Sequence, residues 1–399
     1  MTVRDEATAI AGDIRELRHA IHREPEVGLD LPRTQSKVLD ALGGLPLTIT
    51  TGSKLTSVTA VLSGTSPGDG PTVLLRGDMD ALPVREQTGL PFASRTDGVM
   101  HACGHDLHTS MLAGAARILS QHRHEFSGNV IFMFQPGEEG LGGARDMIDE
   151  GVLAAAGPVK PDTAYGLHVF SDIAMGVFET RPGPLMAASD HLNVTVRGRG
   201  GHGSMPHRGA DPVPVICEIV TALQTMVTRR FDIFDPVVIT VGSLHAGTAR
   251  NVIPDTAWFE GTARSYSAAA RQRLATESVL LAQEIARGYG LDVETEYRHG
   301  YGVTRNDPAQ AAFAAQTVAE VFGQERAVTR PNPHTGAEDF SFVLNEVPGA
   351  FVFLGACPPG TELRTSPSNH SALAVFDDAV LADGTVLLAE LALRRLAQA

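Results

Sequence analysis

Residues 101–108 read HACGHDLH and bring together side chains that bind metal ions. The candidate ligands in this block are His101, Cys103, His105 and His108. Cys103 is one of only three cysteines in the chain. Thiolate, imidazole and carboxylate together suit a borderline divalent ion such as zinc, and also manganese, cobalt or nickel. The block lacks the second half of a zinc-finger spacing, so alone it indicates half of a metal site or a buried thiol among histidines.

Further polar groups follow apolar runs elsewhere in the chain. They are Asp78 and Asp80 in RGDMDALP, Glu138 and Glu139 in FQPGEEG, His168 in AYGLHVF, and His370 in PSNHSAL. In α/β proteins, sites gather at the carboxyl ends of the strands. Each group alone has a structural explanation, because a Glu pair is usually solvated and a lone His is usually a core residue. Their joint occurrence at strand ends favours a metal site.

The paired glutamates suggest a division of labour. Adjacent residues on a loop can face different partners, so one carboxylate can bind a metal while the other stays free as a general base. Such a base would take a proton from a water molecule that the metal has acidified.

The elements around these residues predict an α/β fold. Apolar positions repeat at helical spacing over residues 5–23, and a second helix is expected over 108–123. Apolar runs at 56–64, 71–83 and 128–140 read as strands, and runs of this kind suit a sheet buried on both faces. This order predicts a catalytic domain with a central, mostly parallel sheet.

The pattern changes near residue 185. Alternating segments at 190–200, 236–247, 256–266 and 291–300 read as strands, with helices over 211–230 and within 267–288. The order β-α-β-β-α-β predicts a ferredoxin-like unit inserted into the larger domain. We therefore expect a catalytic metal-binding domain of residues 1–184 and 301–399, and a lid or dimerisation domain of residues 185–300.

Composition narrows the class of protein. The 399 residues carry 32 basic and 46 acidic side chains, a net charge of −14, which argues against nucleic acid and anionic membrane as partners. Three cysteines make no disulfide framework, and the N-terminal residues do not read as a signal peptide. No apolar run approaches the roughly 20 residues of a membrane span. We expect a cytoplasmic protein.

Nine ordered blocks of sequence resemble the M20 metallopeptidase family, in the subgroup of aminoacylases, hippurate hydrolases and auxin-conjugate hydrolases. The blocks are LRHAIHREPEVGLD, RGDMDALPVREQTGLPFAS, MHACGHDLHTSMLAGAA, FMFQPGEEGLGGARDMI, GLHVF, GRGGHGSMPHRGADPV, ARNVIPDTAWFEGTAR, HTGAEDFSFVL and NHSALAVFDDAVL. They run over nearly the whole chain, and any one of them would be a weak signal.

The resemblance implies a site for two divalent metal ions (Zn, Mn, Co or Ni). The implied ligands are Cys103, His105, Glu139, His168 and His370, with Cys103 as the bridge. Glu138 would be the general base, and Asp80 would orient a ligand.

The inserted unit resembles the family's lid and dimerisation domain. In the family, a His at the position of His202 reaches the active site of the partner subunit and supports the oxyanion. Asn251 and Arg264 resemble groups that hold the substrate carboxylate, although from sequence alone Arg264 is equally well explained as a surface charge. The resemblance implies a homodimer or homotetramer formed through the lid.

Two blocks depart from the subgroup. The His168 block usually continues with Pro but reads HVFSDIAMG here, and the last ligand usually sits in LHxP where this chain has SNHSA. Neither departure removes a ligand, but both bear on substrate preference or on affinity for the second metal.

These observations favour a metal-dependent amidohydrolase that cleaves small-molecule N-acyl amino acids to a carboxylic acid and a free amino acid. A dipeptidase or carboxypeptidase of the same fold breaks the same kind of bond and remains an alternative. A non-catalytic metal- or peptide-binding protein would have no reason to keep Glu138 beside a full ligand set. An assembly protein built on the lid would leave the ligands unexplained.

Overall fold

The computed structural model describes residues 2–397, which form two compact units. Unit 1 comprises residues 2–185, 305–332 and 339–397, and unit 2 comprises residues 186–304 and 333–338. The chain passes between them within β7 (Gly183–Met186) and within β14 (Thr304–Asn306). The sequence assigned residues 333–338 to the larger domain, whereas they pack with unit 2, where the N–H of Ala187 donates to carbonyls of His334 and Gly336.

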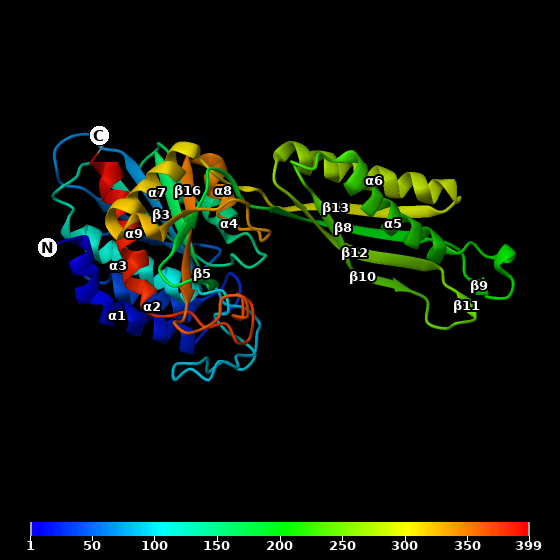
Figure 1. Ribbon diagram of the computed structural model, residues 1–399, viewed down its shortest axis with the longest axis horizontal. Helices are drawn as coiled ribbons and strands as arrows, with labels where there is room; N and C mark the ends of the chain where they lie inside the picture. The colour runs from blue at the N-terminus through cyan, green and yellow to red at the C-terminus, as the bar shows by residue number, and fades with distance from the viewer. Residues whose placement is uncertain (1, 398–399) are drawn as a thin grey trace. The chain divides into compact units, whose positions relative to one another are not determined.

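Unit 1 is built on an eight-stranded sheet (Figure 1). In spatial order the strands are β1 (Thr48–Thr51), β2 (Val58–Ser63), β4 (Asn129–Gln135), β3 (Thr72–Asp78), β5 (Thr163–Ala174), β16 (Gly349–Cys357), β6 (Phe178–Thr180) and β15 (Ala327–Thr329). The central strands β4, β3, β5 and β16 run parallel, and antiparallel pairings join β1, β2 and β6. The predicted mostly parallel α/β sheet is confirmed.

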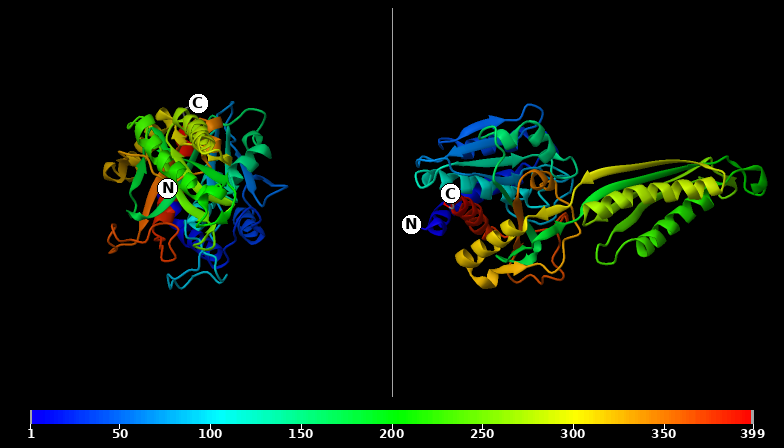
Figure 2. Two further views of the ribbon diagram at one scale, coloured as in Figure 1. Left: turned by 90° about the vertical axis from the view of Figure 1, so that its right-hand side faces the viewer. Right: turned by 90° about the horizontal axis from the view of Figure 1, so that it is seen from above.

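Helices cover this sheet, and most of them share one core. A single apolar cluster joins the sheet to α1 (Val3–Arg23), α2 (Pro32–Leu42), α3 (His105–Gln121), α7 (Pro308–Phe322) and α9 (Val380–Leu396). Val73 and Leu75 of β3 belong to that cluster, and the alternate residues Leu74 and Arg76 therefore face the other side of the sheet. The short helices α4 (Gly143–Asp149) and α8 (Ser341–Glu346) contact each other. Figure 2 shows the same layers from two further directions.

Helix α1 explains how polar groups reach the interior of unit 1. A capping box between Thr2 and Asp5 fixes its first turn, and its buried face repeats every three or four residues. That face includes Ile10, Ile14 and Ile21, but also Arg18 and His22 at positions where an apolar residue is expected. Two ionisable side chains on a buried stripe require partners inside the protein.

Unit 2 is a β-α-β-β-α-β unit. It contains β8 (Ala188–Arg197), α5 (Pro212–Arg230), β10 (Val238–Ala246), β12 (Thr256–Ser265), α6 (Ala268–Gly288) and β13 (Asp292–Tyr301). The sheet order is β10-β12-β8-β13 and every pairing is antiparallel. Alternate residues of β8, such as Leu192, Val194 and Val196, are buried in a core shared with both helices. A short ribbon of β9 (Gly201–His202) and β11 (Val252–Ile253) lies apart from this sheet.

Within residues 2–397, none of the helices combines the length and the apolar character that crossing a membrane requires.

Candidate metal centre

Cys103, at the end of the loop before α3, and His105, the first residue of α3, flank a left-handed glycine. Gly104 has φ 81°, and a Cβ built on it would lie 2.3 Å from a methyl group of Val169. A side chain at this position would therefore both strain the backbone and clash with β5. The glycine lets the loop lie against β5, and Cys103 and His105 are both buried there.

His168, on β5, is held in the ring form that a metal ligand needs. Its Nδ1 donates to the carbonyl oxygen of Val169 at 2.8 Å, and its Nε2 lies 3.4 Å from the sulfur of Cys103. Burial holds the pKa of His168 well below its usual value, so the ring is neutral and Nε2 keeps a lone pair. Ligand atoms of Cys103, His105 and His168 all lie within 4.8 Å of one another.

Asp80 organises the turn that carries the two glutamates. Its Oδ1 accepts the backbone N–H of Glu138 and its Oδ2 accepts that of Glu139, both at 3.0 Å. Its Oδ1 also lies 3.4 Å from Nδ1 of His105. One buried carboxylate thus fixes the glutamate turn and faces a candidate ligand, which is the geometry expected of an orienting group.

Glu138 and Glu139 have different surroundings. Glu138 is 6% exposed, and its Oε1 accepts the N–H of Asp339 at 3.4 Å. Glu139 faces two candidate ligands, with Oε1 3.9 Å from Nε2 of His105 and 3.2 Å from Nε2 of His370. Burial opposes its charge, but the neighbouring histidines lower the pKa of Glu139, so it is ionised.

His370 comes from the loop after β16 and is held in a rare conformation. Within residues 2–397 it is the only non-glycine residue with positive φ, at 72°. Its N–H donates to the carbonyl oxygen of Ala102 at 2.8 Å, which ties this loop to the Cys103 loop. Hydrogen bonds to Cys103 and Glu139 raise the pKa of His370 to about 10. Ligand atoms of Cys103, Glu139 and His370 also lie within 4.8 Å of one another.

This donor set fits divalent ions. Cys103 belongs to two of the ligand groups, one with His105 and His168 and one with Glu139 and His370, so its sulfur is within reach of both. His105 is fully buried, and neither of its ring nitrogens makes a hydrogen bond to the described residues. Buried nitrogens without a partner are costly unless another group binds there. A cation would satisfy His105 and displace the proton from His370.

His108 lies one turn after His105 but is saturated by protein partners. Its Nδ1 lies 2.6 Å from Oδ1 of Asp78, and its Nε2 accepts the N–H of Val169 at 2.8 Å. Although Asp78, His105 and His108 also form a cluster of ligand types, no ring nitrogen of His108 remains for a metal. His101 is buried too, and burial lowers its pKa to about 3.

A buried ion cluster anchors the start of α3 from α1. Oδ2 of Asp106 accepts Nε–H of Arg18 at 3.0 Å and lies 2.9 Å from Nδ1 of His22. Burial opposes the charge of His22, but Asp106 raises its pKa to about 9. Since Asp106 follows His105 directly, these contacts fix the backbone of a candidate ligand. Sequence reasoning missed them, although their signal is present as two polar residues on the buried stripe of α1.

The candidate residues of unit 2 lie at two ends of its sheet. His202 pairs with Val252 across the β9–β11 ribbon, next to Asn251, whereas Arg264 pairs with Ser189 on β8. Thr256 pairs with Arg197 eight residues along the same ladder, so the two ends are about 26 Å apart at roughly 3.3 Å per residue. Figure 1 shows β9 and β11 beyond one end of the sheet. Within one unit 2, therefore, Asn251 and Arg264 do not come together.

His202 is exposed and has a defined tautomer. Its Nδ1 accepts the N–H of Ser204 at 3.2 Å and lies 2.8 Å from the Ser204 hydroxyl. The proton of the neutral ring therefore sits on Nε2, which is available as a donor. Arg264 donates to the hydroxyl of Ser189.

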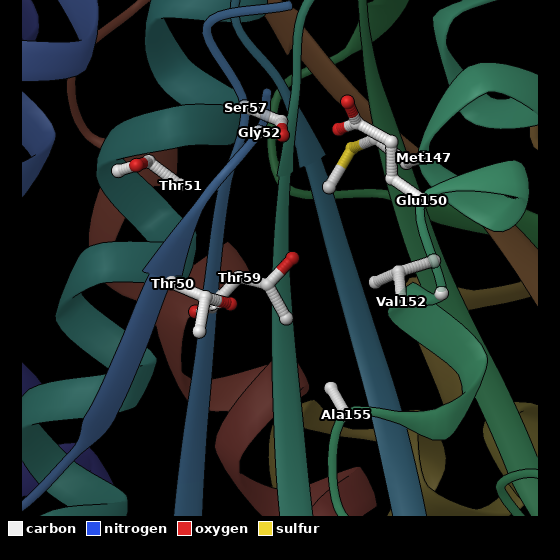
Figure 3. Close-up of a pocket in the computed structure, with 10 residues that line it drawn as sticks. Thr50, Thr51, Gly52, Ser57, Thr59, Met147, Glu150, Val152 and Ala155 are labelled. Atoms are coloured by element: carbon white, nitrogen blue, oxygen red, sulfur yellow. Dashed lines mark hydrogen bonds between the residues drawn. The ribbon is translucent and has the colours of Figure 1, made fainter. Parts of the chain in front are cut away.

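A separate pocket of unit 1 holds none of the candidate ligands. It has a volume of about 260 Å³, and Figure 3 shows Thr50 and Thr59 on one side and Glu150 on the other. Oε1 of Glu150 is occupied by Ser53 and by the N–H of Lys54, so its visible role is to fix that loop.

Comparison with known proteins gives matches over most of the chain. A family model described as peptidase family M20/M25/M40 matches residues 74–394. The chain is 37% identical over 385 residues to thermostable carboxypeptidase 1 of Saccharolobus solfataricus, covering 96% of this chain and 95% of that protein. It is 35% identical over 377 residues to an N-acetylcysteine deacetylase of Bacillus subtilis, covering 94% of this chain and 95% of that protein.

A solved structure extends the likeness to the fold. The YXEP protein of Bacillus subtilis, a dinuclear metal binding peptidase from the M20 family, matches with a TM-score of 0.83 and 32% identity. The match covers 98% of this chain and 100% of that one.

Proposed function

Because the chain belongs to the M20/M25/M40 family of peptidases and is a hydrolase of that family, we propose that it cleaves the amide bond of N-acyl amino acids. The products would be a carboxylic acid and a free amino acid. The single observation that carries the proposal is the position of Cys103 in two overlapping ligand groups, with Glu138 next to the proposed ligand Glu139. A half-site for one structural ion would have no use for the second group or for Glu138.

We propose that Cys103, His105, Glu139, His168 and His370 hold two divalent ions of zinc, manganese, cobalt or nickel. When bound, the ions would polarise the scissile carbonyl and acidify the attacking water. Glu138 takes the proton from that water and delivers it to the leaving nitrogen. The backbone N–H of Asp339 holds the Glu138 carboxylate, and Asp80 holds its backbone, so the base is fixed before substrate arrives.

The proposed roles of unit 2 require two copies of the chain. His202 offers its Nε2–H to the developing oxyanion, and Asn251 and Arg264 bind the substrate carboxylate. Since Asn251 and Arg264 lie at opposite ends of one sheet, the two contacts to one substrate would come from different subunits. This supports a homodimer or homotetramer in which His202 and Asn251 act on the partner's substrate.

The second candidate function is a dipeptidase or carboxypeptidase activity. It is favoured by the 37% identity to a carboxypeptidase, which slightly exceeds the identity to the deacetylase. The bond broken and the proposed roles of Glu138 and the ligands are the same in both, so the two functions differ only in what occupies the acyl side. A binding protein without catalysis is disfavoured because a buried, oriented Glu138 serves no purpose in it.

The test is amine release from a panel of N-acetyl, N-benzoyl and indole-acetyl amino acids together with simple dipeptides. Protein stripped of metal and reloaded with zinc, manganese or cobalt would be compared with Glu138→Gln treated in the same way. Metal-dependent release from the acyl amino acids that is lost in the variant supports the proposal. Release only from dipeptides supports the second candidate, and no release with any loaded metal contradicts both.

A further inference from the structure

Asn369, the residue before His370, makes hydrogen bonds with both the oxygen and the nitrogen of its side-chain amide to groups around the metal centre. Its Oδ1 accepts the N–H and the hydroxyl of Ser171, both at 3.1 Å. Its Nδ2 donates to the carbonyl oxygen of Val169 at 2.9 Å and faces Cys103, at 3.4 Å from the carbonyl oxygen and 3.8 Å from the sulfur. An amide nitrogen has two hydrogens, so one serves Val169 and the other is shared within Cys103.

These contacts join the three segments that carry the candidate ligands Cys103, His168 and His370. Val169 follows His168, Cys103 is itself a candidate ligand, and Asn369 precedes His370. The sequence separations are 266 residues to Cys103 and 200 to Val169, so no local rule brings the segments together. One side chain therefore sets the spacing among Cys103, His168 and His370.

The backbone of His370 shows why the loop needs a restraint from Asn369. A non-glycine residue in the left-handed region is strained and persists only when its surroundings hold it there. His370 has φ 72°, and its N–H is fixed by Ala102. The Asn369 side chain supplies the second restraint, and Ser171, whose hydroxyl also donates to the carbonyl oxygen of Pro367, holds the rest of the loop.

The contact to sulfur has a chemical consequence as well. A thiolate that accepts a hydrogen bond has less electron density to give to a metal, and hydrogen bonds to ligand sulfur are a recognised way of tuning a metal centre. The sulfur of Cys103 also contacts Nε2 of His168 at 3.4 Å and the ring of His370, and both histidines are candidate ligands themselves. The Asn369 amide is therefore a donor to this sulfur that metal binding leaves in place.

We propose that Asn369 is a positioning residue of the metal centre. Its side chain fixes the distances among the Cys103, His168 and His370 segments, and its Nδ2–H lowers the electron density that the Cys103 thiolate can give to a metal. The inference rests on the proposed ligand roles of Cys103 and His370. It also gives a physical meaning to the departure of this chain from the LHxP pattern, because leucine in place of Asn369 could make none of these contacts.

The test uses Co²⁺ as probe, since a cysteine thiolate bound to Co²⁺ gives a sulfur-to-metal charge-transfer band. Asn369→Leu removes all the contacts. Asn369→Asp keeps the shape and the Ser171 contacts but replaces the donor with an acceptor, and serves if the leucine variant does not fold. Ser171→Ala is the matched control, because it removes a β5 hydroxyl that contacts the same loop and leaves the sulfur contact intact. Band position and Co²⁺ dissociation constant are measured for each, with thermal unfolding as the check of folding.

The proposal expects both Asn369 variants to shift the band to lower energy and to weaken Co²⁺ binding by roughly 10- to 100-fold, while Ser171→Ala keeps the wild-type band. An unchanged band in the Asn369 variants overturns the tuning of the thiolate, and unchanged affinity overturns the positioning. A wild-type protein that binds Co²⁺ without any such band would overturn the ligand role of Cys103, and with it this inference. That last outcome is visible in wild type alone, so the two failures are distinguishable.

Discussion

Two polar clusters lie side by side in unit 1, and they differ in how completely the protein itself satisfies them. The ligand cluster is Cys103, His105, Glu139, His168 and His370. The paired network is Arg76, Asp78, His108, Gln135 and Asp339. Both are rich in ionisable groups, and both come from the ends of neighbouring strands and the segments that follow them.

The paired network closes on itself. Arg76 lies 2.6 Å from Asp78 and 3.0 Å from Asp339, and its Nε donates to Gln135 at 2.9 Å. Gln135 and the N–H of Ala144 also donate to Asp339. Burial opposes the charge of Asp78, but Arg76 and the nearby histidines hold its pKa well below its usual value. Its carboxylates are thus held by Arg76 and by hydrogen-bond donors of the protein.

The ligand cluster does not close in this way. Both nitrogens of the fully buried His105 are without hydrogen bonds among residues 2–397, and Cys103 is shared by two groups of ligands. The comparison teaches that residue type alone does not mark a metal site in a buried region. The ligand cluster differs by His105, whose two ring nitrogens make no hydrogen bond although they lie among other ligand-type atoms.

The largest expected effect is on the proposed base beside the ligand cluster. Glu138→Gln keeps the size and the hydrogen bond from Asp339 but cannot take a proton. We expect kcat to fall by about 10²- to 10⁴-fold. Elemental analysis should find wild-type metal content, because Glu138 is not a proposed ligand. A variant with normal turnover would remove Glu138 from the mechanism.

Breaking the paired network should affect folding. Arg76→Leu leaves Asp78 and Asp339 buried without their cation, and loss of one partner from a buried pair costs about 3–5 kcal/mol. Urea denaturation measures the loss in free energy of unfolding. Arg85→Ala is the control, because the Arg85–Asp97 pair is largely exposed and should change stability by about 0.5 kcal/mol or less. Equal effects of the two substitutions would contradict the account of the network.

Metal should stabilise the protein through the ligand cluster. Zinc at about 100 times its dissociation constant would raise the free energy of unfolding by about 2.7 kcal/mol for a single site. His105→Asn should abolish most of this gain while the metal-free protein still folds. A zinc-dependent shift in Tm that survives in His105→Asn would place the bound ion elsewhere.

The smallest expected effect concerns the His22–Asp106 pair that anchors α3. The pKa of His22 is raised from 6.5 to about 9, so its contribution to stability is fully present below pH 6.5 and is lost as the pH rises through 9. His22→Gln should therefore destabilise metal-free protein more at pH 6 than at pH 10, by about 1–3 kcal/mol. Denaturation curves at the two pH values measure it, and a pH-independent difference would argue against a charged His22.

Sequence patterns predicted the elements well and the contacts less well. The helices and strands expected from periodicity are present, because periodicity reports burial along one element, but the strands predicted over 71–83 and 128–140 end at Asp78 and Gln135. The spacing of HACGHDLH did not separate His105 from His108, since that distinction depends on Asp78 and Val169, which lie far away in the chain. Asn369 appeared in the sequence only as part of the departure from LHxP, and its contacts gave no signal because its partners are about 200 residues or more distant.

The candidate residues of unit 2 likewise show that contacts between distant residues could not be predicted from the sequence. The sequence resemblance assigned one substrate carboxylate to Asn251 and Arg264 together. The strand register places them at opposite ends of the sheet, so a shared role requires two subunits. That requirement comes from the geometry of β8 and β12, which spacing along the chain does not report.

The central claim is that the ligand cluster holds two divalent ions bridged by Cys103. Its most direct test is the metal content per chain after zinc loading and dialysis, measured by elemental analysis for wild type and for Cys103→Ala. The account predicts two ions per chain in wild type and fewer than one in the variant, because the bridge contributes to both sites. Two ions in both proteins, or none in wild type, would contradict it.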